Sequence, residues 1–243
     1  MKDIAIILVT FNSARYIARF LDTLARSMKE SECLLVVVDN NSSDNTIELI
    51  RASYPSAHII LNSENKGFAT GNNQGITYAL SSGARWLMLA NHDLSFGDHW
   101  WPPLKRTLDA DSSIGAAQPL ILLYPETDRI NSCGNALHFL GFGFTKGYRK
   151  KVGEWKCESG DVGYCSGAAV VYTREALEKV GMFDESYFMY HEDTDLSWRM
   201  QIAGYRTVLV RESVVYHQYE FSRSISKFYW IERNRFLTIL KNY

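Results

Sequence analysis

An acidic cluster near residue 193 has the residue types and the spacing that chemistry requires. Glu192, Asp193 and Asp195 place three carboxylates within four residues, directly after the aromatic run 187–190. Ionised carboxylates are costly to remove from water, so they must be paired, hydrogen-bonded or placed at a ligand. Asp193 and Asp195 would also suit the first turn of a following helix, but one helix cap does not explain both Glu192 and Asp193. The cluster therefore predicts the edge of an active site.

A second cluster, formed by Asn91, His92 and Asp93, ends an apolar run and suits a divalent cation. Mg²⁺ and Mn²⁺ prefer oxygen ligands, and one or two carboxylates together with substrate phosphates often hold them. His217 ends a later apolar run and would complete an Asp/His pair, since Mn²⁺ accepts imidazole better than Mg²⁺ does. The alternatives are a polar strand end for the first cluster and a packed structural histidine for His217.

A polar run at 39–44 contains only Asp, Asn and Ser and could form a turn followed by a helix cap. Capping needs one such residue, whereas this run supplies six. A carboxylate at a strand tip can accept hydrogen bonds from a nucleobase edge or a ribose, which makes Asp39 a candidate ligand residue.

Several short motifs are excluded by their spacing. His191 and Glu192 do not begin the zinc-protease pattern HExxH, because Asp195 stands where the second histidine should be. The acids at 193 and 195 lack the glycine of an EF-hand loop. The loop 65–73 has neither GxGxxG nor GxxxxGK spacing, so dinucleotide-binding and P-loop classes lose most of their weight.

Alternating strands and helices must position these side chains. The sequence predicts apolar strands, with amphipathic helices after the first three, at 4–9, 34–38, 57–61 and 86–90. This order predicts an α/β fold, with a mostly parallel central sheet covered by helices on both faces. Ligands of such sheets bind beyond the carboxyl ends of the strands, where Asn12, Asp39 and Asp93 fall.

The second half of the chain is less regular. Residues 119–163 are rich in glycine and aromatic residues and predict hairpins and a mobile loop. The remaining predicted elements are a strand at 167–172, helices at 174–180 and 195–203, and short strands at 207–210 and 214–216. Because we find no linker or repeat, we expect one catalytic domain over residues 1–220 and a tail over 221–243.

The tail alternates apolar with basic residues and predicts a basic amphipathic helix. Such a helix can lie on a membrane surface, and packing against the domain or a partner is at least as plausible. The sequence stops abruptly at Tyr243, as an excised catalytic domain would.

Composition excludes further classes. The 243 residues are 46% hydrophobic and carry a net charge of −1, which gives no electrostatic footprint for nucleic acid. Cys33, Cys133, Cys157 and Cys165 form no CxxC pair, which favours reduced, packed thiols and a cytoplasmic setting. The sequence contains no run of about 18 apolar residues, so it predicts no membrane span. The first apolar run is too short for a signal peptide.

The order of these motifs resembles the family 2 inverting glycosyltransferases with the GT-A fold, particularly the rhamnosyltransferase-like branch. The resemblance covers about residues 4–220. The matching motifs are Val9–Asn12, Val38–Asp44, Asn65–Ala69 with Asn72 and Asn73, Asn91–Asp93, Ser166–Ala168, Gly181–Glu185, Glu192–Leu196 with Arg199, Gly204 with Tyr205, and His217.

The resemblance implies a role for each matching position. Asp193 would be the catalytic base, with Glu192 beside it near the acceptor. Asp93 matches the last acid of the family's Asp-x-Asp motif and would bind Mn²⁺ or Mg²⁺ at the diphosphate, with His217 as a further ligand. Asn91 stands in place of the first acid. The residues expected to bind the donor are Thr10, Asn12, Asp39, Asn41, Lys66, Gly67, Asn72 and Asn91.

The implied reaction moves a sugar from a nucleoside-diphosphate donor to a glycan or lipid-linked acceptor in cell-surface polysaccharide synthesis. It requires a base for the acceptor hydroxyl and a positive centre for the departing diphosphate. We find no separate nucleophile for a retaining mechanism. The rivals are a catalytically silent nucleotide-sugar or glycan-binding module, which would lack the base, and a sugar nucleotidyltransferase, which would release pyrophosphate.

Overall fold

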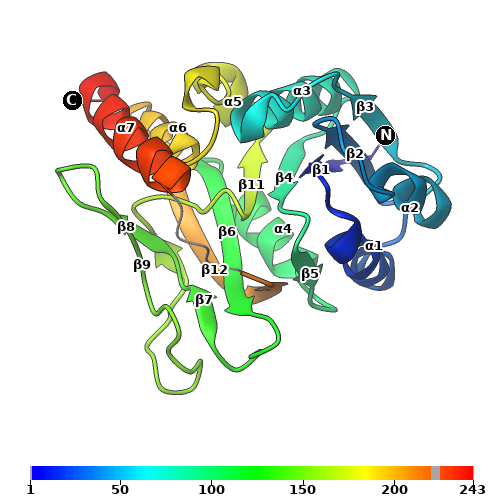
Figure 1. Ribbon diagram of the computed structural model, residues 1–243. Helices are drawn as coiled ribbons and strands as arrows, with labels where there is room; N and C mark the ends of the chain where they lie inside the picture. Colours follow the sequence, from blue (N-terminus) through cyan, green and yellow to red (C-terminus); the bar gives the residue numbers. More distant parts are fainter. Residues whose placement is uncertain (1, 220–224, 243) are drawn as a thin grey trace.

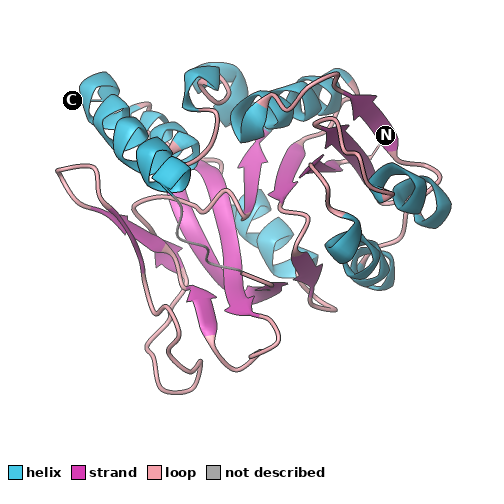
Figure 2. Ribbon diagram, in the orientation of Figure 1, coloured by secondary structure: helices cyan, strands magenta, loops and turns pink. Residues whose placement is uncertain are grey.

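A ten-stranded mixed sheet forms the centre of the protein, which a computed structural model describes for residues 2–219 and 225–242 (Figures 1 and 2). Its strands are β1 (Ile4–Thr10), β2 (Cys33–Asp39), β3 (His58–Leu61), β4 (Trp86–Ala90), β5 (Leu94–Phe96), β6 (Ile114–Leu123), β7 (Ile130–Ser132), β10 (Gly160–Asp161), β11 (Ala169–Thr173) and β12 (Arg206–His217). A separate hairpin is formed by β8 (Asn135–Leu137) and β9 (Gly143–Thr145).

Helices cover both faces of the sheet, as the sequence predicted (Figure 2). They are α1 (Ala14–Ser27), α2 (Thr46–Ser53), α3 (Gly67–Ser81), α4 (Trp101–Ala110), α5 (Arg174–Val180), α6 (Glu192–Ile202) and α7 (Ile225–Asn242), with a 3₁₀ turn η1 at Glu185–Tyr187.

The strand order confirms the predicted parallel sheet. Strands β3, β2, β1 and β4 lie side by side and are all parallel, and Thr10 is the register partner of Asp39. Strand β11 then runs antiparallel between β4 and β6, and β12 pairs parallel with β6. The carboxyl ends of β1, β2 and β4 therefore meet at one edge, because parallel strands share one direction.

The alternation of side chains along β1 divides the core into two layers. Ile4, Ile6 and Leu8 pack with residues of α1 and α4, whereas Ala5 and Ile7 pack with residues of α3, α5 and α6. The apolar residues of α1 recur at helical spacing and are buried, so hydrophobic burial explains why this segment folds as a helix on that face.

The second half departs from the prediction in three places. Strand β6 and helix α4 were not predicted, although every residue of β6 is buried. The two predicted short strands are one strand, β12, whose pairing with β6 shifts register between Val210 and Val214. Helix α6 begins at Glu192 instead of Asp195, so all three acids lie in its first turn.

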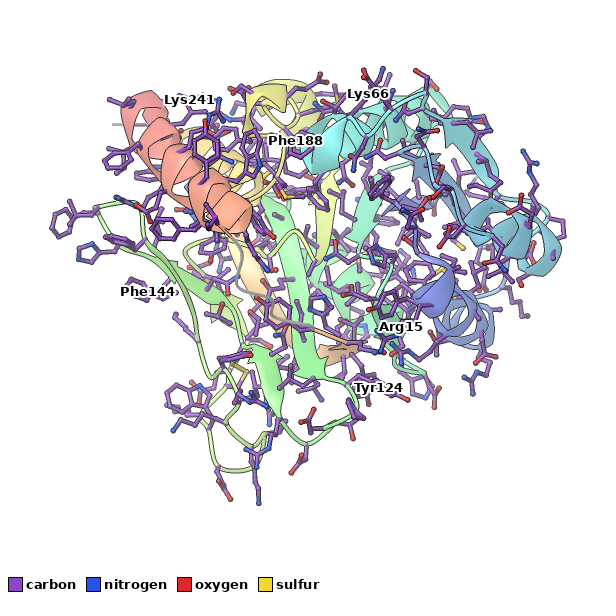
Figure 3. All side chains as sticks on the ribbon, in the orientation of Figure 1. Arg15, Lys66, Tyr124, Phe144, Phe188 and Lys241 are labelled. Atoms are coloured by element: carbon purple, nitrogen blue, oxygen red, sulfur yellow. A yellow bond between two sulfur atoms is a disulfide. The ribbon has the colours of Figure 1, made fainter. Side chains whose placement is uncertain are left out.

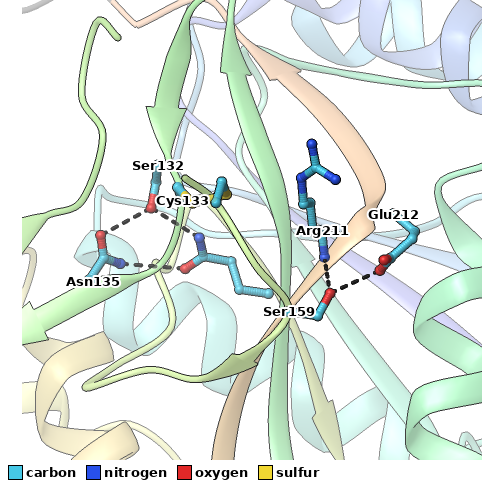
Figure 4. The surroundings of a disulfide bond; sticks show 8 residues. Ser132, Cys133, Asn135, Ser159, Arg211 and Glu212 are labelled. Carbon is cyan, nitrogen blue, oxygen red and sulfur yellow. Dashed lines mark hydrogen bonds between the residues drawn. A yellow bond between two sulfur atoms is a disulfide. The ribbon is translucent and has the colours of Figure 1, made fainter. Parts of the chain in front are cut away.

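The predicted hairpin region contains a disulfide, which corrects the expectation of reduced thiols for two cysteines. Cys133 and Cys157 are bonded, with their Cα atoms 6.0 Å apart. Figure 4 shows Ser132 and Asn135 in a hydrogen-bonded group beside this bond. The loop folds back on itself and brings together two cysteines that are 24 positions apart, which their spacing did not indicate. Cys33 and Cys165 are free and buried, as expected.

The tail forms the predicted helix, α7, which packs beside α6 (Figure 1). The expected boundary at residue 221 falls within 220–224, outside the described residues. In the part of the chain that is described, no helix combines the length and the apolarity needed to cross a bilayer.

We predict that Gly75→Ala destabilises the fold. A Cβ atom at Gly75 would lie 2.5 Å from Ile7 Cγ2, where α3 packs closely on β1. Overpacking costs about 1–3 kcal/mol, which exceeds the gain of up to about 1 kcal/mol from replacing a helical glycine with alanine. Urea unfolding should therefore give a lower free energy of unfolding. The control is Gly153→Ala, whose Cβ meets nothing within 4 Å; equal stability of the two variants would contradict the close packing.

Candidate active site

The carboxylate of Asp39 is fixed at the joined ends of β1 and β2. Thr10 Oγ1 donates to Asp39 Oδ1 at 2.7 Å, and the backbone N–H of Ser42 donates to Oδ2 at 2.8 Å. The Ser42 hydroxyl also donates to Oδ1 at 2.5 Å. Since each carboxylate oxygen has two lone pairs, Asp39 keeps acceptor capacity for a ligand while its orientation is set by protein donors.

Asn12 and Asn41 form the exposed rim beside Asp39. Both have left-handed backbone conformations, with φ of 49° and 66°, which asparagine tolerates better than most residues. Asn12 Oδ1 accepts from the backbone N–H of Ser43 at 2.8 Å, and the Asn12 N–H donates to Ser42 Oγ at 2.9 Å. These bonds tie the two loops together, so the predicted donor residues of β1 and β2 form one surface.

The start of α3 lies next to this rim and carries the other predicted donor residues. Lys66 is exposed, and Gly67 has a φ of +82°. Asn40, beside Asp39, donates its amide to the Gly67 carbonyl at 3.0 Å, which joins the two loops. Asn72 is buried and donates to the Phe68 carbonyl at 2.9 Å, so its amide supports the first turn of α3.

Asp93 and His217 lie together although they are far apart in sequence. Strand β5 pairs antiparallel with β12 and sets Leu94 opposite His217. His217 Nε2 is 3.0 Å from Asp93 Oδ1, without the alignment of a hydrogen bond. Burial acts to raise the pKa of Asp93, but the nearby His217 outweighs it, and the pKa lies below its usual value.

His217 is oriented by a residue that the sequence did not single out. Its Nδ1 lies 3.0 Å from Oδ1 of Asn131, the middle residue of β7. Because an amide oxygen only accepts, Nδ1 carries the shared proton, and Nε2 faces Asp93. Hydrogen bonding of one ring nitrogen commonly sets the other for a metal ion. No sequence signal pointed to Asn131, because its position depends on how β7 pairs with β6.

The Asp93–His217 pair suits a divalent cation. Adjacent ligands of an octahedral ion, each at about 2.1 Å, stand about 3.0 Å apart, as these two atoms do. The buried Asp93 Oδ1 has no aligned donor, so its lone pairs are available. Within residues 2–219 and 225–242, no group of three or more His, Cys, Asp or Glu side chains is arranged to hold a metal ion. Asn91 precedes this pair at the end of β4.

The two adjacent acids of α6 have different environments. Asp193 is half-buried and accepts from the backbone N–H groups of Gly167 and Thr194, at 2.8 and 2.7 Å. Glu192 is buried, and its Oε2 has no hydrogen-bond partner among the described residues. Burial and the charge of Asp193 raise the pKa of Glu192 well above its usual range. Adjacent acids with divergent environments can take different roles.

The third acid of the cluster is structural. Asp195 is fully buried and accepts from Arg199 Nε at 2.9 Å. Arg199 also donates to the carbonyls of Val180 and Met182, which ties α6 to the loop after α5.

Strand β11 connects the Asp93–His217 pair to the acidic cluster. Its pairing with β4 sets Ala169 opposite Ala90, and the Asn91 N–H donates to the Ala168 carbonyl at 2.9 Å. The preceding residue, Gly167, is the one that donates to Asp193. The structure therefore brings the motifs at residues 91–93, 166–168 and 192–195 together at one edge of the sheet.

Comparison with known sequences identifies the family. Residues 5–181 match the sequence profile described as Glycosyl transferase family 2. The N-acetylglucosaminyl-diphospho-decaprenol L-rhamnosyltransferase of Mycobacterium tuberculosis is 30% identical over 89% of this chain and 76% of its own. The dTDP-rhamnosyl transferase RfbF of Shigella flexneri is 26% identical over 84% of this chain and 64% of its own.

Solved structures show the same fold. GalNAc-T7, crystallised with UDP, GalNAc and Mn²⁺, aligns over 99% of this chain with a TM-score of 0.77 and 15% identity. The mannosyltransferase PcManGT from Pyrobaculum calidifontis, with GDP-Man and Mn²⁺, aligns over 99% with a TM-score of 0.66 and 17% identity. The chain spans 48% and 65% of these two structures. The chain therefore has the GT-A fold and belongs to glycosyl transferase family 2, in its rhamnosyltransferase-like branch, as a glycosyltransferase.

Proposed function

We propose that this glycosyltransferase moves a hexosyl or deoxyhexosyl group from a nucleoside-diphosphate donor to a glycan or lipid-linked acceptor, with inversion, in cell-surface polysaccharide synthesis. One observation carries the proposal: Asp39, the Asp93–His217 pair and Asp193 lie at one edge of the sheet. The names of the mycobacterial and Shigella relatives, which specify rhamnosyl transfer and a decaprenol-linked substrate, support this substrate class.

Asp193 acts as the base in this proposal. Its two backbone hydrogen bonds hold the carboxylate in place and leave lone pairs to accept the proton of an acceptor hydroxyl. Glu192 is buried, and burial and the charge of Asp193 raise the pKa of its carboxyl well above the usual range, which favours its neutral form. Attack by the acceptor oxygen on the face opposite the departing diphosphate inverts the sugar carbon, because no protein nucleophile intervenes.

The sugar donor is held by the rim around Asp39 and by the Asp93–His217 pair. Asp39, Thr10, Asn12 and Asn41 orient the base and ribose, and the start of α3 at Lys66 and Gly67 flanks the diphosphate and sugar, with Asn72 and Asn91 supporting it. Asp93 and His217 would hold Mn²⁺ or Mg²⁺, which supplies positive charge for the departing diphosphate. The Mn²⁺ bound in the structures of GalNAc-T7 and PcManGT supports a divalent cation.

We predict that Asp193→Asn lowers turnover by roughly 10²–10⁴-fold while donor binding stays nearly unchanged. The amide keeps the size and the acceptor oxygen of the side chain but cannot take a proton. Turnover is measured as release of nucleoside diphosphate with saturating acceptor, and donor affinity by calorimetry.

The matched control for Asp193→Asn is Glu192→Gln, which we expect to retain most of its turnover because the raised pKa of Glu192 favours the neutral form that the amide resembles. An inactive Glu192→Gln beside an active Asp193→Asn would move the base to Glu192. Activity in both variants would favour the silent binding module, and release of pyrophosphate would favour a nucleotidyltransferase.

We predict that Mn²⁺ strengthens nucleoside diphosphate binding through Asp93. With whichever of dTDP, UDP and GDP binds most tightly, calorimetry should show at least about tenfold stronger binding in Mn²⁺, equivalent to about 1.4 kcal/mol. Asp93→Ala should lose this dependence, whereas Asp98→Ala, which changes an exposed acid just beyond β5, should keep it. A variant at Asp93 with the full Mn²⁺ effect would remove the cation from the proposal.

We also propose that one face of the protein lies on a lipid membrane. Helix α7 exposes Phe228, Phe236 and Leu240, and the adjoining loop of the hairpin exposes Phe139. Arg235 links the two elements by donating to the Leu140 carbonyl at 2.9 Å, and Figure 3 shows Phe144 on the outer side of the hairpin. Exposed apolar patches of this kind mark interaction sites, and a lipid-linked acceptor is presented at a membrane.

We predict that the protein cosediments with vesicles of phosphatidylethanolamine and phosphatidylglycerol at 3:1. The double variant Phe139→Ser, Leu240→Ser should bind at least about tenfold more weakly, because two apolar side chains leave the lipid interface. Leu61→Ser is the control, since Leu61 is 58% exposed but lies on β3, at the opposite edge of the sheet. Equal loss in both variants, or no binding by the unchanged protein, would refute this surface.

We propose residues 1–220 as the catalytic domain, with the tail as its membrane-facing part. The cytoplasmic setting stays a prediction. The Cys133–Cys157 bond removes the argument from reduced thiols, since disulfides are rare in the cytosol.

A further inference from the structure

The segment just before the proposed base has an unusual backbone. Phe188, Tyr190 and His191 have φ values of 60°, 69° and 68°, in the left-handed region that residues with bulky side chains seldom adopt. Such conformations persist only where the surrounding structure holds them, and they concentrate at functional sites. The segment leads directly into the first turn of α6, so its conformation sets where Asp193 lies.

One side chain of α7 holds this segment. The amide nitrogen of Asn234 lies 2.8 Å from each of the carbonyls of Tyr187, Met189 and Tyr190. Asn234 is fully buried, so water cannot replace these bonds. An amide N–H₂ group donates two protons, which the three carbonyls share.

The remaining carbonyl of the segment, that of Phe188, faces the start of α3, where the sugar donor is proposed to bind. The backbone N–H groups of Phe68 and Ala69, in the first turn of α3, donate to the Phe188 carbonyl at 2.6 and 3.2 Å. Figure 3 shows Phe188 between Lys66, at the start of α3, and the end of α7 that carries Lys241. Consecutive carbonyls therefore connect α7 on one side and the start of α3 on the other.

Other residues of the inner face of α7 contact side chains around the segment, but not its carbonyls. Thr238 Oγ1 lies 3.0 Å from the Tyr187 hydroxyl, and Asn242 donates to Asp195 Oδ1 at 3.0 Å. Trp230 stacks on Phe188 with the ring centroids 5.1 Å apart. Positions 234, 238 and 242 recur at every fourth residue and lie on one face of the helix. This inner face is polar, whereas the outer face of α7 is apolar.

We infer that Asn234 is a positioning residue for the transfer reaction, an inference that rests on the proposed role of Asp193. Its amide fixes the left-handed segment, which places the base at the start of α6 and caps the start of α3 beside the sugar donor. A residue without two N–H donors leaves buried carbonyls unpaired, and the segment relaxes toward ordinary backbone angles. The base then loses its alignment, while the nucleotide contacts at Asp39 and Asp93 are untouched.

The test compares Asn234→Ala with Thr238→Val in the full chain. Turnover is expressed per diphosphate-binding site, so that unfolded protein does not enter the rate. The number of sites is the stoichiometry measured by calorimetry, with Mn²⁺ and the nucleoside diphosphate that binds most tightly. We expect Asn234→Ala to lower kcat at least tenfold with the diphosphate Kd within twofold. Thr238→Val removes a buried hydroxyl from the same helix face but none of the three carbonyl bonds, and should keep kcat within twofold.

Two outcomes overturn the inference: kcat per binding site within twofold of the unchanged protein in Asn234→Ala, or an equal loss of kcat in Thr238→Val. If Asn234→Ala does not fold, Asn234→Ser replaces it, because the serine hydroxyl restores one hydrogen-bond donor. We expect Asn234→Ser to lose less kcat and to keep the same diphosphate Kd. An unchanged kcat in Asn234→Ser counts against the inference. An active Asp193→Asn would refute the proposed function itself. An inactive Asp193→Asn beside a fully active Asn234→Ala would refute only the role of Asn234.

Discussion

Parallel hydrogen bonding among β2, β1 and β4 is the constraint on which the site depends. Parallel strands must be joined by crossovers, and here helices on the two faces of the sheet provide them. Each strand therefore ends at the same edge, and its last polar residue meets its neighbour's, as Thr10 meets Asp39. The loops at that edge are then joined by side-chain amides such as Asn40, so the nucleotide rim is a consequence of strand direction and not a separate structure.

The antiparallel strand β11 adds the acidic cluster of α6 to this edge. It runs against β4, so its beginning lies where β4 ends, and the N–H of Gly167 reaches Asp193. Burial then separates two adjacent acids that have nearly the same chemistry. Glu192 is buried, and burial and the charge of Asp193 raise the pKa of its carboxyl, whereas half-buried Asp193 is held by two backbone donors.

The first half of the fold was predictable because its signals are local. Apolar strands and amphipathic helices alternate there, and strand ends mark the ligand edge. Strand β6 was not predicted because Pro119 lacks an N–H, which argues against a central strand. In the structure Pro119 pairs with Val210, next to the point where the register between β6 and β12 shifts. The pairing of Asp93 with His217 followed from ligand chemistry and from family resemblance, and not from periodicity. Asn131, Asn234 and the Cys133–Cys157 bond depend on contacts between distant segments, which composition and spacing do not encode.

The position of Asn234 in the chain has a consequence for how the enzyme matures during synthesis. The carbonyls that it holds come from residues 44–47 positions earlier, so the ribosome has already made them when their donor does not yet exist. At roughly 5–20 residues per second, that delay is on the order of 2–9 s. Strands β1 to β4 and the rim around Asp39 can assemble during this interval, because they come from the first half of the chain. The nascent protein would thus form this rim first, and the segment before Asp193 would be fixed only when α7 emerges.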